Sequence, residues 1–282
     1  MNILHISDLH FGPRHWQGNN ELLLEKLNTY NADIVINTGD STTDSLESEF
    51  ESASKFLNSI DCANRFSIMG NHDKRNLRSQ DFFREYISDS ETIYPLQPEK
   101  CTKKNVFLDR KITKVKNNFT DFNYIKTFTL HGESILVVGI DSNELYSDNG
   151  CVDDEILRTL SLKIEQLSYD KLLFLCHHTF LETDNDPLFN SYNLHNFINK
   201  HKIEHVFCGH THKLSVKESI DHYNQHSFTQ YVSGTLTCSN HEEDTNMFLF
   251  YENWAEKGMK LHIVRVFIEG DQLLFKEELI TF

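Results

Sequence analysis

Five runs of apolar residues in this chain each end in a short block of glycine, aspartate, asparagine or histidine. Short apolar runs closed by such residues are typical of buried strands that end in loops. In open α/β sheets, the carboxyl ends of the strands are where ligands bind. We therefore expect five strand ends to bring polar side chains to one edge of the fold. The blocks are Asp8-Leu9-His10, Gly39-Asp40, Gly70-Asn71-His72-Asp73, His177-His178 and Gly209-His210-Thr211-His212.

The side chains in these blocks predict a site for two metal ions. Carboxylate, imidazole and amide oxygen ligands, without a block of thiolates, suit Mn²⁺, Fe and Zn²⁺, with Mg²⁺ less favoured. Two ions held roughly 3.5–4 Å apart need a bridging group, and an aspartate is a good bridge. Such a pair lowers the pKa of a bound water and stabilises the attacking and leaving oxygens of an in-line displacement. The expected chemistry is hydrolysis of a phosphate ester.

The order of the five blocks resembles the calcineurin-like metallophosphoesterase superfamily, and it spans residues 8–212 of the 282. The resemblance implies a four-layer α/β/β/α sandwich of two mixed β-sheets flanked by helices. It also implies that Asp8, His10, Asp40 and His212 bind the first metal, with Asp40 as the bridge. The second metal is then completed by Asn71, His177 and His210.

Two further residues of the third block are candidate catalytic residues. His72 resembles the family's general acid, which lies close to the leaving-group oxygen without binding metal. Asp73 and Asp44 are candidates to orient His72 or to hold the loops. A neighbouring carboxylate would favour the charged, proton-donating imidazolium. By the same resemblance, His178 lies near the site without ligating.

Within the superfamily, the details of the blocks look most similar to the class III cyclic-nucleotide phosphodiesterase branch. The second block continues Gly39-Asp40-Ser41-Thr42-Thr43-Asp44, unlike the G-D-x-V-D-R-G pattern of protein Ser/Thr phosphatases. It also lacks the tyrosine that purple acid phosphatases place shortly after the aspartate. The expected substrate is a small phosphate ester, with a cyclic nucleotide as one candidate. A DNA or RNA nuclease is the alternative, and a non-catalytic protein-binding scaffold is a third hypothesis.

Charge argues against a general affinity for nucleic acid, because the net charge is −15. One segment differs from this balance, since residues 100–116 contain seven basic residues and only one acidic residue, Asp109. This segment is either a solvated basic face or part of an insertion or cap, at about residues 95–120, that grips a phosphate-rich substrate. The seven basic residues are Lys100, Lys103, Lys104, Arg110, Lys111, Lys114 and Lys116.

The remaining pattern predicts a single domain over residues 1–282, built from two sheets and flanking helices. Apolar residues at helical spacing predict helices over residues 19–30, 42–59, 79–86, 153–167 and 188–201. A strand pair is expected within 106–115, and a hairpin over 124–130 and 135–140 that turns at His131-Gly132-Glu133. Further strands are expected at 231–235, 247–251, 261–268 and 273–279.

The sequence favours a cytoplasmic protein. No stretch approaches the roughly 18 apolar residues that span a bilayer. The first expected strand starts at Asn2 or Ile3, so we expect no cleavable signal peptide. The six cysteines show no C-x-x-C pair or framework spacing, which is consistent with free thiols in a reducing compartment. The oligomeric state is left open.

Overall fold

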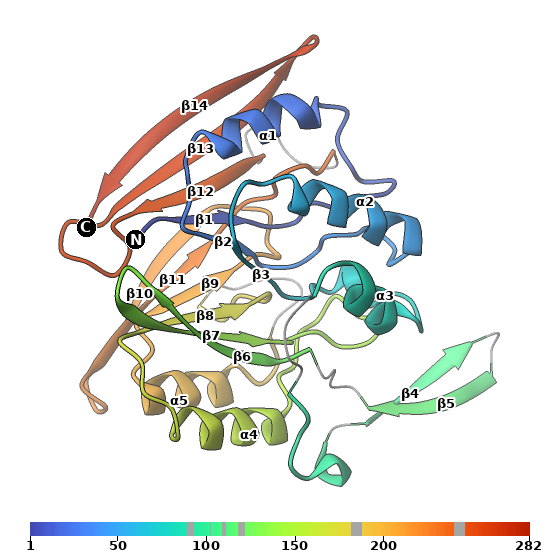
Figure 1. The fold of residues 1–282 in the computed structure, drawn as a ribbon. Coiled ribbons are helices and arrows are strands. Elements are labelled where there is room, and N and C mark those ends of the chain that lie inside the picture. Colours follow the sequence, from blue (N-terminus) through green and yellow to red (C-terminus); the bar gives the residue numbers. More distant parts are fainter. Residues whose placement is uncertain (89–92, 102, 109–110, 118–121, 182–187, 240–245) are drawn as a thin grey trace.

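Two mixed β-sheets pack face to face and carry helices on their outer faces (Figure 1). The computed structural model describes residues 1–88, 93–101, 103–108, 111–117, 122–181, 188–239 and 246–282, and for 103–108 and 111–117 it describes the backbone alone. The four-layer fold class predicted from the sequence is confirmed.

The first sheet has the strand order β14-β13-β12-β1-β2-β3. Its central strands β1, β2 and β3 run parallel, with Ile3 beside Ile34 and Ile34 beside Asn64, so their carboxyl ends meet at one edge. The strands are β1 (Ile3–Ile6), β2 (Ile34–Asn37), β3 (Asn64–Ser67), β12 (Met247–Glu252), β13 (Lys260–Glu269) and β14 (Gln272–Thr281).

The second sheet has the order β10-β11-β9-β8-β7-β6. Here β7, β8, β9 and β11 are parallel, while β6 and β10 pair antiparallel at the two edges. The strands are β6 (Tyr124–Leu130), β7 (Glu133–Ile140), β8 (Lys171–Cys176), β9 (His205–Cys208), β10 (Ser215–Asp221) and β11 (His226–Val232).

In the described part of the chain, five α-helices flank the sheets, and local chemistry determines where several of them begin. The Asn19 side chain caps α1 by accepting from the backbone N–H groups of Glu21 and Leu22. Asp153 caps α4 in the same way. The helices are α1 (Asn20–Asn28), α2 (Glu47–Asn58), α3 (Ser79–Tyr86), α4 (Asp154–Ile164) and α5 (Ser191–His201), with short 3₁₀ turns at His72–Lys74 and Pro98–Lys100.

Three large apolar clusters separate these layers. The cluster between the sheets joins residues of both, including Ile36, Leu175 and Phe207, all fully buried. A second cluster packs α1 and α2 on the first sheet, and a third packs α4 and α5 on the second. At roughly 25 cal/mol per Å² of apolar surface, this burial is the main term that holds the layers together.

Three elements differ clearly from the sequence prediction. The strand expected at 231–235 is β11, which covers His226–Val232 and ends before Ser233. Helix α2 begins at Glu47 and not at residue 42, because residues 42–45 form a loop that bonds to the third block. Strand β10 was not predicted, since its sequence SVKESID is polar and its side chains are half-buried or exposed at a sheet edge.

The predicted strand pair within 106–115 exists as β4 (Lys103–Leu108) and β5 (Lys111–Asn117). These strands form a separate two-stranded sheet that projects from the rest of the fold (Figure 1). The structure does not describe most of the basic side chains between residues 100 and 116. Their predicted role in gripping the substrate therefore stays a prediction. Within the described part of the chain, no helix is long and apolar enough to cross a membrane.

Candidate metal centre

The five predicted blocks follow the carboxyl ends of β1, β2, β3, β8 and β9, as their positions in the sequence required. Five of the predicted ligands sit in the left-handed backbone region, which non-glycine residues seldom adopt. Strained conformations of this kind cluster at functional sites, where the surrounding structure holds them. These residues are Asp8 (φ 55°), His10 (φ 50°), Asp40 (φ 53°), His210 (φ 73°) and His212 (φ 58°).

Glycine beside these ligands allows the loops to approach closely. Gly39 has φ 106°, and a Cβ there would lie 2.7 Å from the backbone nitrogen of Gly70 and from Nδ1 of His177. A Cβ at Gly209 would lie 1.9 Å from Oγ of Ser7. A larger residue at either position would push the loops apart.

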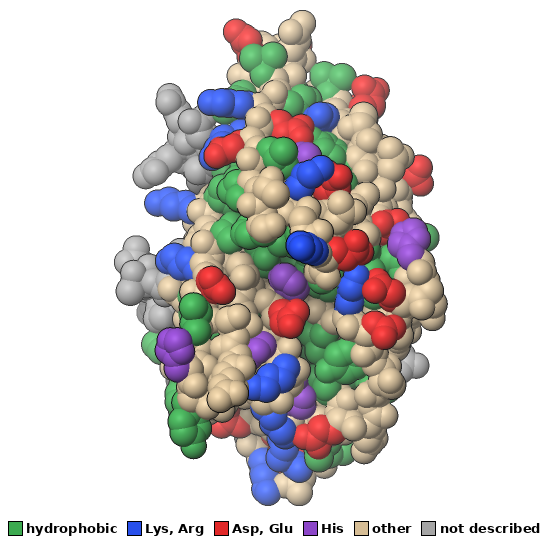
Figure 2. Space-filling model, turned by 90° about the vertical axis from the view of Figure 1, so that its left-hand side faces the viewer, with side chains coloured by type: hydrophobic (Ala, Val, Ile, Leu, Met, Phe, Trp, Pro, Cys, Tyr) green, Lys and Arg blue, Asp and Glu red, His purple; other side chains and the backbone are tan. Residues whose placement is uncertain are grey.

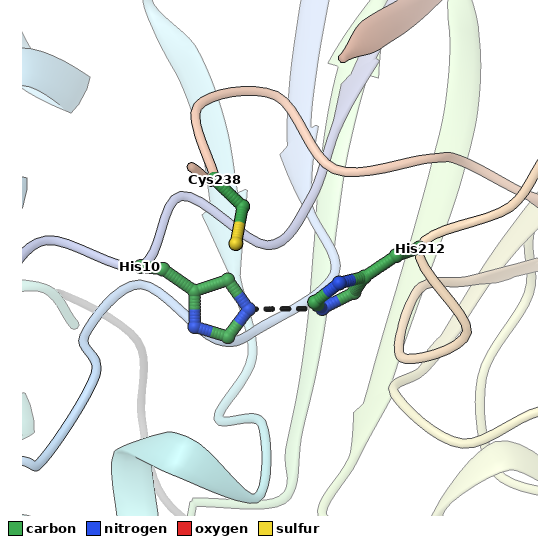
Figure 3. Close-up of side chains that lie close together, drawn as sticks. All are labelled: His10, His212 and Cys238. Atoms are coloured by element: carbon green, nitrogen blue, oxygen red, sulfur yellow. Dashed lines mark hydrogen bonds between the residues drawn. The ribbon is translucent and has the colours of Figure 1, made fainter. Parts of the chain in front are cut away.

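Four predicted ligands form the first group, and their ligand atoms all lie within 4.8 Å of one another: Asp8, His10, Asp40 and His212. The Nε2 atoms of His10 and His212 are 2.9 Å apart and point toward each other (Figure 3). Nε2 of His212 lies 3.2 Å from Oδ1 of Asp8. Imidazole nitrogens that converge with carboxylate oxygens are the donor set that a divalent transition metal takes.

The second group is centred on the amide of Asn71. Its Oδ1 lies 3.0 Å from Nε2 of His177 and 3.0 Å from Nδ1 of His210. The other ring nitrogen of His177 donates a hydrogen bond of 2.7 Å to the carbonyl oxygen of Thr38. Metal-binding histidines usually donate their second N–H to such a carbonyl, which leaves Nε2 for the ion.

Asp40 joins the two groups. Its Oδ2 is 3.8 Å from Nε2 of His10, and its Oδ1 is 3.5 Å from Nε2 of His177. The carboxylate is buried and also accepts a 2.8 Å hydrogen bond from the backbone N–H of His72. One oxygen toward each group is the placement that a bridging aspartate needs.

The charges of the two groups fit bound cations. Burial alone would lower the pKa of His177, but the Asp40 carboxylate raises it to about 10. Burial alone would raise the pKa of Asp8, but the hydrogen bond and charge of His212 lower it to about 2. Apart from the nearby Nε2 of His212, the buried Oδ1 of Asp8 has no hydrogen-bond partner among the described residues. Since metal ligands must be deprotonated, cations here would replace imidazole protons beside the carboxylates.

His72 lies next to the first group, with its ring 4.7 Å from that of His10. Its Nδ1 donates to the carbonyl oxygen of Thr43 at 2.7 Å, and its Nε2 accepts from Nη1 of Arg14 at 3.1 Å. A backbone carbonyl therefore orients this imidazole, and not a carboxylate as expected from the sequence. Burial lowers the pKa of His72, although Asp40 and Thr43 oppose the shift.

Asp73 is fully buried and faces the loops that carry the ligands. It accepts hydrogen bonds from the backbone N–H groups of Ser41 (3.1 Å), Thr42 (2.9 Å) and Gly70 (3.0 Å). Of the two roles expected for it, holding the loops is the one that these contacts fit, and a catalytic role stays a prediction. Burial and the nearby Asp40 charge raise the pKa of Asp73 to about 7. Asp44, the other candidate, is exposed.

Sequence reasoning did not single out three residues that lie at this site. Arg14 contacts His72, and Asp148 contacts Asn71. The thiol of the buried Cys238 lies beside His10 and His212 (Figure 3). None of them belongs to a block at the end of one of the five strands, and only the folded chain brings them near the ligands.

Comparisons with known proteins identify the family and the fold. The profile of the family described as calcineurin-like phosphoesterase matches residues 1–214. A dimetal phosphatase from Danio rerio is structurally similar, with a TM-score of 0.64, 11% identity, and coverage of 100% of this chain and 98% of that chain. A search of curated protein sequences finds no match.

Two other solved structures share the fold at low identity. GAP50 from Plasmodium has a TM-score of 0.56 and 11% identity, with coverage of 100% of this chain and 88% of that chain. A purple acid phosphatase from yellow lupin (Lupinus luteus) has a TM-score of 0.56 and 10% identity, with coverage of 94% of this chain and 51% of that chain. At such identities these likenesses establish the fold alone.

The fold and the paired ligand groups define a protein of the metallophosphoesterase type. The chain belongs to the calcineurin-like phosphoesterase family, whose profile covers most of its length.

Proposed function

We propose that this chain is a dinuclear-metal phosphodiesterase that hydrolyses a small phosphate diester, with cyclic nucleotides among the candidate substrates. The observation that carries the proposal is the position of Asp40 between two groups of side chains that could bind metal. Asp8, His10 and His212 would hold one ion, and Asn71, His177 and His210 the other. When bound, such a pair supplies an activated water and stabilises charge on the attacking and leaving oxygens.

The chain's own residues supply the proton and the positive charge that ester cleavage needs. The imidazole of His72 lies beside the first ligand group, and in protonated form its Nε2 would give a proton to the leaving oxygen. Nη1 of Arg14 lies 3.1 Å from this nitrogen. A guanidinium here can bind a phosphate oxygen and displace its contact with the imidazole when substrate enters.

A groove beside His212 supports the proposal that the substrate is small and anionic. Its volume is about 440 Å³, within the roughly 300–1,000 Å³ typical of small-molecule sites. Three cationic side chains share it with apolar ones, although Arg265 also pairs with Glu278 at 3.1 Å. A second cavity of about 240 Å³ contains none of the predicted ligands. The groove is lined by His212, Lys213, Leu214, Met247, Arg265, Phe267 and Lys276.

A hydrolysis panel on Mn²⁺-loaded protein tests the proposal. Bis-p-nitrophenyl phosphate, p-nitrophenyl phosphate, cyclic nucleotides and single- and double-stranded DNA would be compared. We expect turnover of the small diesters to exceed that of DNA. Degradation of DNA with weak small-molecule turnover, together with a steep loss of DNA affinity as salt rises, would favour the nuclease alternative. No turnover in a protein that binds no metal would favour a scaffold.

Charge reversal tests the groove separately. Lys213→Glu combined with Lys276→Glu should raise KM for small diesters more than it lowers kcat, because the groove contacts the part of the substrate that does not react. Lys163→Glu combined with Lys257→Glu makes the same charge change at exposed sites outside the groove. Equal kinetics in the two double variants would contradict a role for the groove.

A further inference from the structure

The amide of Asn71 has two ends, and each faces a different partner. Its oxygen points to His177 and His210, where the second ion is proposed to bind. Its Nδ2 donates a hydrogen bond of 2.9 Å to Oδ1 of Asp148. An ionised carboxylate accepts hydrogen bonds and does not donate them, so Asp148 selects the orientation in which the amide nitrogen faces away from the metal position.

Two side chains hold the Asp148 carboxylate and its backbone in place. Nη2 of Arg75, just after the third block, forms an ion pair with Oδ1 of Asp148. Nε2 of His178 donates a hydrogen bond of 2.9 Å to the backbone carbonyl of Asp148. This contact ties the loop that carries Asp148 to the side chain of the residue that follows His177 in the sequence.

The ring of His178 is itself fixed on its other side. Oγ of Ser142 donates to Nδ1 of His178 at 2.9 Å and accepts from its backbone N–H at 3.1 Å. Gly150 packs directly on this ring, since a Cβ there would lie 2.7 Å from it. His178, fully buried and next in sequence to a predicted ligand, therefore serves as a support for the loop that carries Asp148.

We propose that Asp148 is a positioning residue for the second metal ion: its carboxylate turns the Asn71 amide so that Oδ1 is presented to the ion, while Arg75 holds the carboxylate and His178 holds the backbone of Asp148. This inference rests on the proposed dinuclear centre. It also gives His178 a role other than metal binding. Outer partners of metal ligands typically contribute about 10–100-fold to metal affinity.

Calorimetric titration with Mn²⁺ alone tests this role without relying on activity. Asp148→Ala should weaken binding of one ion by roughly 10–100-fold and leave the other ion at wild-type affinity. Asp148→Asn retains an acceptor oxygen and should recover most of the loss. Asp81→Ala, which removes the acid of an exposed pair with Arg84, is the matched control and should bind both ions normally.

A double-mutant cycle shows whether Arg75 acts through Asp148. Arg75→Ala should weaken the same ion in the wild-type background and add nothing in the Asp148→Ala background, because the second change then removes no further contact. If the wild-type protein binds two ions and the Asp148→Ala variant binds each of them with wild-type affinity, this inference alone is overturned. Equal weakening of both ions would also overturn it. Wild-type protein that does not bind two ions would overturn the dinuclear centre on which it rests.

Discussion

The two ends of the parallel strands carry similar residue types in different surroundings. At the amino ends, charged groups pair with opposite charges at the surface: Lys171 lies 2.8 Å from Glu133, and His131 lies 3.0 Å from Asp33. Acidic and basic side chains are interspersed over this face (Figure 2). At the carboxyl ends, buried imidazoles and carboxylates crowd together around two positions. The candidate metal centre is recognised by this crowding and not by the number of histidines.

Histidine shows the contrast most directly. His205, at the start of β9, packs against the rings of Tyr231 and Trp254, and burial lowers its pKa to about 4. His177 follows the next strand at the other end, and there the Asp40 carboxylate overcomes burial and raises the pKa to about 10. Packing favours the neutral form of His205, whereas His177 lies beside a negative charge that a metal cation could neutralise.

Removal of the bridging carboxylate should have the largest effect. Asp40→Ala should weaken binding at both metal positions by more than about 100-fold, beyond the usual loss for an outer partner, and should abolish hydrolysis. Metal analysis and titration with Mn²⁺ measure this change. Asp44→Ala, an exposed acid four residues away, is the control and should keep both ions. An Asp40→Ala protein that retained two ions would contradict the bridging role.

Removal of the predicted acid should have an intermediate effect. His72→Ala should keep both ions, because His72 contacts Thr43 and Arg14 and is not among the proposed ligands. Its rate should fall by roughly 10²–10⁴-fold on esters with poor leaving groups, and far less on activated aryl esters. Steady-state kinetics on both classes of ester measure the difference. Equal losses on the two classes would contradict a proton transfer to the leaving oxygen.

The smallest effect is expected for His205, at the amino end of β9, and it concerns the pH dependence of stability. The pKa of His205 is lowered in the folded protein, so between pH 6.5 and about 4 the unfolded chain binds a proton that the folded protein does not. Its contribution to stability is therefore present above pH 6.5 and is lost as pH falls from 6.5 to about 4, by up to about 1.4 kcal/mol per pH unit.

His205→Phe should remove that slope and leave hydrolysis unchanged. The ring is kept against Tyr231 and Trp254, so packing is largely preserved. Denaturant unfolding of metal-loaded protein between pH 5 and 7.5 measures the slope in wild type and variant. Identical slopes would mean that His205 titrates alike in both states, and lost activity would mean that the two ends are coupled.

Much of this centre was predictable because strand ends and ligand types are both local properties of the sequence. Asp8 and Asp40 each follow an apolar run that the structure shows as β1 or β2. Parallel pairing of those strands then brings the two carboxylates to one edge. The helix over residues 79–86 was predicted with its observed bounds, since its apolar residues pack on one side.

The supporting contacts were not predictable in the same way. Asp148 lies in a loop 77 residues after Asn71 and follows no block, and Arg14 reaches His72 across 58 residues. A single sequence carries no signal for such long-range pairs. The carbonyl of Thr43 that orients His72 was missed for another reason, because a backbone acceptor leaves no trace in residue type.

Anomalous scattering from crystals soaked in Mn²⁺ tests the central claim most directly. Our account predicts two peaks roughly 3.5–4 Å apart, with Asp40 between them and Asn71 beside the second. A single peak at the first group would contradict a dinuclear centre. Peaks away from the seven proposed ligands would also contradict it; these are Asp8, His10, Asp40, Asn71, His177, His210 and His212.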